Sequence, residues 1–184
     1  GTVSQLVGSS SGIHARHAKY YLRSVRNDVK DPVSKVLIES GVPYEKDVTN
    51  PNNYVFYFPM KAPEGAITRN DMSAIDQLEL WLIYQRYWSE HKPSITVSVG
   101  DNEWIEVGNW VYNHFDELSG ISFLPRFDHV YAQAPYQDLT EEEYNNWVSK
   151  MPSTIDWNLL SELEKEDYTT ASQELACTGG SCEI

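Results

Sequence analysis

The chain contains few basic residues, only two cysteines and no long apolar stretch. Its 14 Lys and Arg residues stand against 27 Asp and Glu residues, a formal net charge of −13. Because nucleic-acid binding depends on clustered cations that neutralise phosphates, this balance argues against a nucleic-acid partner. No apolar run approaches the length of a membrane span and no charged-then-apolar leader opens the sequence, so we expect no membrane association. Two cysteines outside any disulfide framework predict a reducing, cytoplasmic setting.

Aromatic residues are abundant, with 6 Trp and 12 Tyr among 184 residues. This content argues against disorder over most of the length, and the length suffices for one domain with a core or for a large fragment of a bigger domain. Acidic residues dominate beyond Trp157. We therefore expect a folded region over residues 1–157 and an acidic, flexible tail over residues 158–184, with little fixed structure after about Tyr168.

Local signals predict four helices. Asp31 and Pro32 are typical of an N-cap and first helical position, and that helix should end at Gly41. Thr140 and Glu143 form a capping box. Two more helices are expected over residues 71–91 and 103–118, the first apolar enough to be buried on more than one side. The side chains expected to face inward include Trp81, Ile83, Tyr87, Val107, Phe115, Tyr144, Trp147, Val148 and Met151.

Strands are predicted over residues 20–26, 54–59, 94–99 and 121–125. Residues 54–59 are aromatic on both faces, which indicates a strand covered above and below. The order helix, strand, helix, strand from residue 71 to residue 125 is typical of an α/β layer with parallel pairing. The basic residues of the strand expected over residues 20–26, Arg23 and Arg26, are expected on a solvated face rather than in a ligand site.

The two cysteines, Cys177 and Cys182, lie close together in a glycine-containing turn near the end of the chain. Gly179 and Gly180 let the backbone fold until the two sulfurs meet. This pattern favours a reversible dithiol on a mobile arm over an incidental thiol pair. The two cysteines could also be two of the ligands of a zinc ion. That interpretation is disfavoured because structural zinc needs four nitrogen or sulfur ligands and no His lies nearby in the sequence. The five histidines show no ligand spacing either, so we expect no metal site.

The chain opens with Gly1, Thr2, Val3 and Ser4, and further serines and glycines follow as far as Gly12. Backbone N–H groups in such a loop can face an anion. Composition alone slightly favours a flexible leader or a cloning remnant. No Lys follows the glycines at phosphate-loop spacing, which argues against a nucleoside-triphosphatase P-loop.

A series of short blocks occurs in a specific order along the whole chain. They are residues 1–4, 12–14, 20–23, 58–63, 94–97, 120–125 and 133–136, followed by the Cys177–Cys182 segment. In this order they resemble the catalytic chains of ribonucleotide reductases, above all the adenosylcobalamin-dependent class II enzymes. Each block alone is weakly specific, whereas the ordered series ending in the cysteine pair is strongly specific.

The resemblance implies an α/β fold that forms the C-terminal portion of the family's ten-stranded α/β barrel and ends in a flexible redox tail. It implies that Gly1, Thr2, Val3 and Ser4 belong to the loop that holds substrate phosphate. Cys177 and Cys182 would re-reduce the active-site disulfide and would be reset by a thioredoxin-like dithiol. Residues 123–125 read Phe-Leu-Pro where class I enzymes carry a tyrosine pair, so the resemblance implies a radical made from adenosylcobalamin.

The family's radical cysteine and the two reductant cysteines of its barrel lie upstream of its phosphate loop, and none is present here. The resemblance therefore implies a ribonucleoside di- or triphosphate reductase that acts only with a complementary N-terminal chain. The present chain would be a fragment, half of a split enzyme or the product of an intein interruption. We also expect a part-barrel to leave apolar faces uncovered, such as residues 54–58.

Two other functions stay open from the residues alone. One is a redox-sensitive binding or structural module that docks a larger protein without turnover. The other is a small thiol–disulfide oxidoreductase, which is disfavoured because no Cys-x-x-Cys pair occurs at a helix N-terminus.

Overall fold

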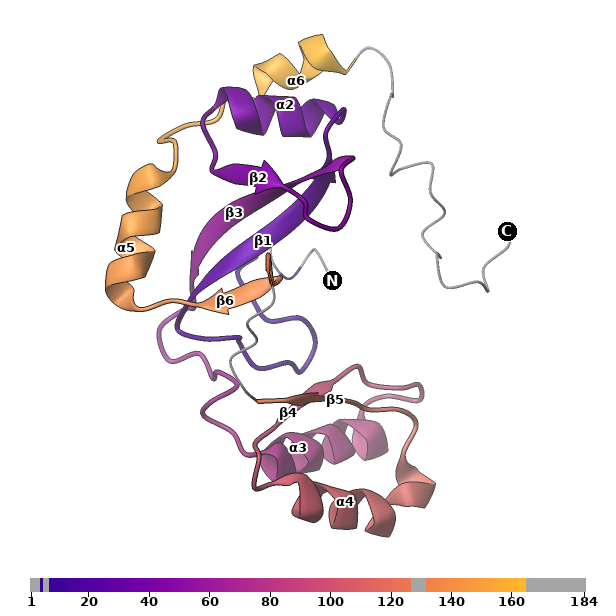
Figure 1. Cartoon of the computed structure of the whole chain (residues 1–184). Helices are drawn as coiled ribbons and strands as arrows, with labels where there is room; N and C mark the ends of the chain where they lie inside the picture. The colour runs from indigo at the N-terminus through magenta and orange to yellow at the C-terminus, as the bar shows by residue number, and fades with distance from the viewer. Residues whose placement is uncertain (1–3, 5–6, 127–131, 165–184) are drawn as a thin grey trace. The chain divides into compact units, whose positions relative to one another are not determined.

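The computed structural model describes residues 4, 7–126 and 132–164 (Figure 1). They divide into two compact units. Unit 1 is built from segments 1–19 and 62–129, and unit 2 from segments 20–61 and 130–184. The sequence analysis expected one folded region over residues 1–157, so the division into two units is a finding of the structure. Unit 2 assembles its core from segments that are far apart in the sequence.

Unit 2 contains a four-stranded sheet in the order β2-β3-β1-β6. The strands are β1 (Tyr20–Asp28), β2 (Tyr44–Lys46), β3 (Asn53–Lys61) and β6 (Tyr136–Asp138). Every pairing is antiparallel, and β1 and β3 align from Tyr20 opposite Lys61 to Asp28 opposite Asn53. Strands β1 and β3 confirm the predictions for residues 20–26 and 54–59. The two short outer strands have too few residues to show a pattern in the sequence.

Helices cover both faces of this sheet (Figure 1). On one face, α5 (Glu141–Lys150) supplies Trp147, which packs with Leu22, Val55 and Tyr57. On the other face, α2 (Pro32–Glu39) supplies Leu37, which packs with Phe56. Strand β3 is thus covered above and below, as its aromatic pattern predicted. The expectation that residues 54–58 lie uncovered in this chain is wrong, because α2 and α5 come from the same chain.

The predicted helix caps of unit 2 are confirmed. The Asp31 carboxylate accepts the Val33 N–H at 2.7 Å, and Gly41 has a φ of 84°. Thr140 and Glu143 form the reciprocal capping box. Val148 was expected to face inward, but its side chain is 43% exposed, because Tyr144 and Trp147 hold the buried side of α5.

The first residues of the segment expected to be a flexible tail are helical. Asn158–Leu163 form α6, which lies against α2. Residues 165–184, and with them the expectation of little fixed structure after Tyr168, lie outside the described residues.

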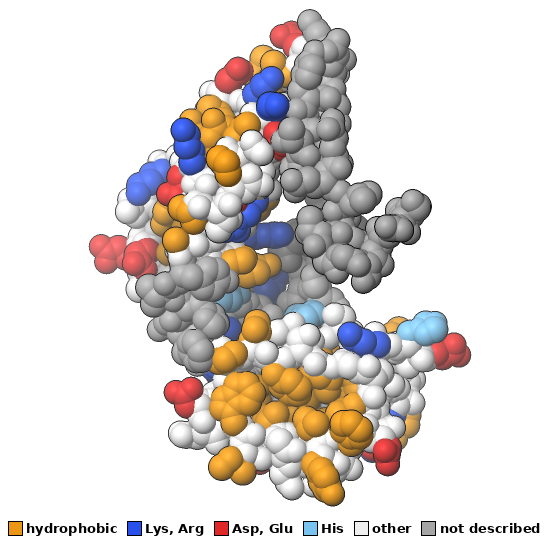
Figure 2. All heavy atoms as spheres, turned by 45° about the vertical axis from the view of Figure 1, so that its right-hand side comes forward, with side chains coloured by type: hydrophobic (Ala, Val, Ile, Leu, Met, Phe, Trp, Pro, Cys, Tyr) orange, Lys and Arg blue, Asp and Glu red, His pale blue; other side chains and the backbone are white. Residues whose placement is uncertain are grey.

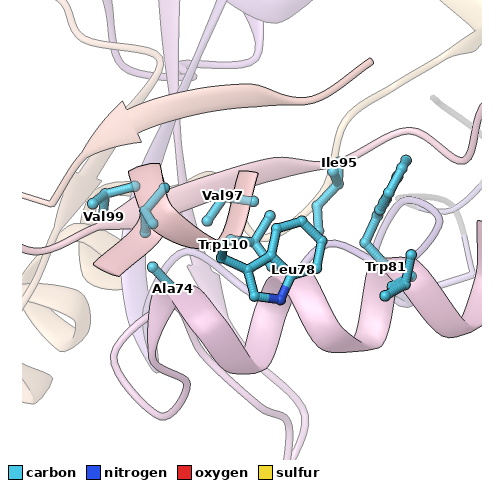
Figure 3. Packing of buried hydrophobic residues seen from close by; sticks show 9 residues of the cluster. Ala74, Leu78, Trp81, Ile95, Val97, Val99 and Trp110 are labelled. Carbon is cyan, nitrogen blue, oxygen red and sulfur yellow. The ribbon is translucent and has the colours of Figure 1, made fainter. Parts of the chain in front are cut away.

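Unit 1 contains the parallel pair β4 (Thr96–Val99) and β5 (Ser122–Pro125), confirming the predicted parallel pairing. Helix α3 (Ala74–Tyr87) precedes β4, and α4 (Trp104–Asn113) followed by a short 3₁₀ turn (Phe115–Glu117) connects β4 to β5. Figure 3 shows side chains of α3 directed toward those of β4, with the Trp110 indole among them. The buried core of this unit is Ala74, Leu78, Trp81, Leu82, Ile95, Val97, Val99, Val107 and Trp110.

Several apolar side chains of unit 1 point to solvent instead of the core. Ile83, Tyr87 and Phe115, all expected inside, are 55%, 80% and 70% exposed. The expectation that α3 is buried on more than one side is therefore wrong. Two strands and one neighbouring helix cover only one stripe of a helix within this unit. Figure 2 shows hydrophobic side chains gathered on the visible face of this unit.

None of the helices in the described segments combines the length and apolar character needed to cross a bilayer.

Candidate substrate loop

Of the predicted site residues, only Ser4 belongs to the described part of the chain. Gly1, Thr2 and Val3 lie outside it, and so do both tail residues, Cys177 and Cys182. The structure therefore shows the surroundings of one member of the predicted phosphate loop and leaves the cysteine pair as a prediction.

Ser4 is held in a closed loop that extends to Ser11. Its hydroxyl lies 2.9 Å from the Ser11 hydroxyl, and its carbonyl accepts the Ser9 N–H at 2.9 Å. Gly8 lies between them with a φ of 69°, a left-handed conformation that glycine adopts without a steric penalty. The described residues of the serine-rich opening, Ser4 and residues 7–11, are therefore joined by hydrogen bonds.

Arg16 contacts this loop, and the residue is only 7% exposed. Its guanidinium donates a hydrogen bond to the Gly8 carbonyl. Its main chain is paired on both sides, since its N–H donates to the Ile67 carbonyl at 2.9 Å and its carbonyl accepts the Arg69 N–H at 2.8 Å. The sequence carried no signal for this burial. Gly8, the partner of Arg16, is eight residues away in a loop, a relationship that no regular periodicity encodes.

The loop is anchored and contains a weakly basic imidazole. Ile13 packs against the core of unit 1, and the His14 N–H donates to the Ser11 carbonyl at 3.0 Å. Burial lowers the pKa of His14 below its usual value of about 6.5, so the ring is neutral at pH 7. The loop thus brings the hydroxyls of Ser4 and Ser11 together, and the Arg16 guanidinium contacts its main chain at Gly8.

A second polar cluster lies in unit 2 and centres on Gln133. Its amide nitrogen donates to the Glu45 carboxylate at 2.8 Å and to the Lys46 carbonyl at 2.7 Å, and its amide oxygen accepts the Val48 N–H at 3.0 Å. Burial, together with a hydrogen bond to Glu45, raises the pKa of Tyr57. Because these groups satisfy one another, the cluster holds the 133–136 block in place and offers no reactive group. The sequence analysis did not predict it.

Metal-binding groups do not gather in the described parts of the chain. No set of three or more His, Cys, Asp or Glu side chains there lies close enough together to hold a metal ion.

Comparison with known proteins finds adenosylcobalamin-dependent reductases among the relatives of this chain. A probable adenosylcobalamin-dependent ribonucleoside-triphosphate reductase of Dictyostelium discoideum is 29% identical over 100% of this chain. The adenosylcobalamin-dependent ribonucleoside-triphosphate reductase of Euglena gracilis is 28% identical over 96% of this chain. The enzyme of the same name from Lactobacillus leichmannii is 28% identical over 100% of it. The chain spans about a quarter of the length of these relatives. No family model matches the chain.

A solved structure leads to the same group. The crystal structure of a B12-dependent (class II) ribonucleotide reductase matches 91% of this chain and 24% of its own, with a TM-score of 0.73 and 25% identity. Over its whole length the chain is therefore similar to adenosylcobalamin-dependent ribonucleotide reductases, of which it matches about a quarter of the length. The resemblance seen in its sequence is confirmed.

Proposed function

We propose that this chain forms part of a class II ribonucleotide reductase, which converts ribonucleotides to deoxyribonucleotides. The observation that carries the proposal is the similarity over the full chain, in sequence and in fold, to enzymes of this one kind. Because the relatives are named as acting on ribonucleoside triphosphates, we propose triphosphates as the substrates. The chain covers about a quarter of such an enzyme, so the remainder must be supplied by the same or a second polypeptide.

The relatives are named for adenosylcobalamin, which would supply the radical that starts the reaction. The corrin ring itself supplies the equatorial ligands of the cobalt, so this cofactor requires no cluster of protein donors. We assign no described residue to the cofactor and propose that its site lies mainly in the remainder of the enzyme.

Gly1, Thr2, Val3 and Ser4 are proposed to hold the substrate phosphates. The closed loop around Ser4 supports this role, because its hydroxyl is already fixed beside that of Ser11. Hydroxyl and main-chain N–H donors bind phosphate oxygens. A Thr2→Val, Ser4→Ala double variant should bind nucleotide more weakly, as measured by equilibrium binding. Unchanged affinity would argue against the loop as a phosphate site.

Cys177 and Cys182 are proposed as the dithiol that resets the active site after each turnover. Their two thiols would pass two electrons and two protons to the active-site disulfide, which becomes two thiols while the tail pair becomes a disulfide. A thioredoxin-like dithiol would then reduce the tail disulfide by the same exchange. Keeping the pair reduced requires a reducing compartment, so a cytoplasmic location belongs to the proposal.

A complementary part of the enzyme is the proposed partner of unit 1. Parallel sheets are normally covered on both faces, whereas the described residues of unit 1 show only two parallel strands. Ile105 and Tyr112, on one face of α4, are 90% and 82% exposed. Apolar side chains gathered in this way are typical of a protein–protein contact.

Dithiol-driven turnover tests the proposal. The chain is combined with the remaining reductase polypeptide, a ribonucleoside triphosphate and a dithiol, with and without adenosylcobalamin, and deoxyribonucleotide is measured. We expect product only with both polypeptides and the cofactor. Formation of a stable complex without any turnover would instead favour a redox-sensitive binding module.

A further inference from the structure

We propose that Arg16 is a positioning residue, which fixes Ser4 for nucleotide binding through the peptide group that joins Gly8 and Ser9. This inference rests on the proposed role of residues 1–4 in holding the substrate phosphates. Arg16 itself does not need to touch the substrate.

One peptide group links Arg16 to Ser4. In a planar trans peptide the C=O and the N–H point in opposite directions. The Gly8 C=O accepts from the Arg16 guanidinium, and the N–H of the same peptide, on Ser9, donates to the Ser4 carbonyl at 2.9 Å. The peptide is therefore held from both sides, and turning it would break both hydrogen bonds.

Arg16 is a rigid support for this peptide. Its N–H and C=O are both used in main-chain bonds to the 67–69 segment, and it forms an isolated parallel bridge with Thr68. The side chain is almost fully buried, so it has few alternative positions. A hydrogen bond from a charged guanidinium is also stronger than one between neutral groups.

The contact between the Ser4 and Ser11 hydroxyls also depends on the peptide that Arg16 holds. The Ser4 and Ser11 hydroxyls lie 2.9 Å apart, so a shift of the Ser4 main chain also moves this pair. Loss of the Arg16 contact should therefore misplace Ser4 and its hydroxyl while leaving the reacting groups, which lie in the remainder of the enzyme, unaffected. The expected signature is weaker nucleotide binding at an unchanged catalytic rate.

Steady-state kinetics of the complete reductase, containing this chain and its complement, test the proposal. Arg16→Met should raise the KM for the nucleotide about tenfold with kcat unchanged. Removing a charge-assisted hydrogen bond costs a free energy that corresponds to about a tenfold change in an equilibrium constant. Arg16→Lys keeps a donor without the planar fork and should recover part of the loss. Lys35→Met removes the same charge from an exposed position on α2 and should change neither constant.

A purely structural role for Arg16 makes a different prediction. It would lower the melting temperature and the active fraction, so that kcat falls while the KM of the surviving enzyme stays the same, and that result would overturn the proposal. An unchanged KM in Arg16→Met would overturn it as well.

Gly8→Ala is the second variant in case Arg16→Met does not fold. A Cβ at Gly8 meets no atom within 4 Å, so the strain arises only from the φ of 69° and shifts the peptide that Arg16 holds. It should also raise the KM, and a wild-type KM would count against the proposal. If the Thr2→Val, Ser4→Ala variant keeps full nucleotide affinity, the phosphate loop itself is wrong. If that variant loses affinity while the Arg16 and Gly8 variants bind normally, only the positioning role fails.

Discussion

The side-chain amide of Gln77 bonds both main-chain groups of Ser98. Its oxygen accepts the Ser98 N–H at 3.1 Å, and its nitrogen lies 3.4 Å from the Ser98 carbonyl oxygen. The Gln77 amide thus takes the place of a neighbouring strand at this point of β4. Gln77 is buried, which suits a group that satisfies main-chain donors and acceptors away from water.

Gln77→Ala should destabilise the protein because it leaves the Ser98 N–H without this partner, while the Ser98 carbonyl keeps the hydrogen bond that it accepts from Arg126 at 3.0 Å. We expect a loss of about 1–3 kcal/mol in the free energy of unfolding, the usual cost of an unsatisfied buried polar group. Urea denaturation measures it. Gln85→Ala, on the same helix, removes only an exposed contact to Ser119 and should cost far less. Equal losses in both variants would contradict the edge-closing role of Gln77.

Glu103 should make the free energy of unfolding depend on pH. Burial alone would raise its pKa, but the N–H groups of Ala74 and Gly100, at 2.9 and 2.6 Å, together with Arg126, lower it overall. A carboxylate whose pKa is lowered by folding stabilises the folded state above its unfolded pKa. That contribution is lost as the pH falls through the folded pKa.

Glu103→Gln should therefore weaken the dependence of unfolding free energy on pH below about pH 4.3, the ordinary pKa of glutamate. Denaturant titrations across the acid range measure the slope. Glu106→Gln, at an exposed position on α4, is the matched control and should keep the wild-type slope. A wild-type slope in Glu103→Gln would show that the carboxylate is not coupled to folding.

Cys177→Ser and Cys182→Ser should each abolish repeated turnover and leave a single turnover intact. The first turnover uses the thiols already present in the active site, whereas later ones need the tail dithiol to restore them. Rapid-quench measurement of product per enzyme, with a dithiol protein as the only reductant, separates the two phases. Equal loss of the first and of later turnovers would rule out the shuttle role.

Ile105→Lys combined with Tyr112→Lys should weaken binding of the chain to the rest of the reductase. Both side chains are largely exposed, so the fold should tolerate the change, while a charge on a buried contact should cost at least about tenfold in Kd. Titration calorimetry measures the Kd. Val48→Lys replaces an apolar residue of unit 2 that is 66% exposed and serves as the control. An unchanged Kd in the double variant would exclude this face as the contact.

Local patterns in the sequence predicted much of the secondary structure. The Asp31 cap, the Thr140–Glu143 capping box and the parallel pairing of β4 with β5 were all correct. Caps and β-branched runs act over a few residues, so their signals are complete within the chain segment that carries them. The ordered blocks likewise sufficed to show the resemblance to class II reductases, which the comparisons confirmed.

The tertiary structure alone decided which residues pair across long separations. Ser24 donates its hydroxyl to the Ala134 carbonyl at 2.7 Å, a contact between positions 110 residues apart. The burial of Arg16 and the exposure of Ile83 and Tyr87 were equally unpredictable, because a helix or loop residue is buried only where another segment arrives to cover it. The sequence by itself determined the longer helices and strands and the family that the chain resembles. The burial of Arg16 and its contacts with Gly8 and the 67–69 segment depended on tertiary packing, which no short-range pattern encodes.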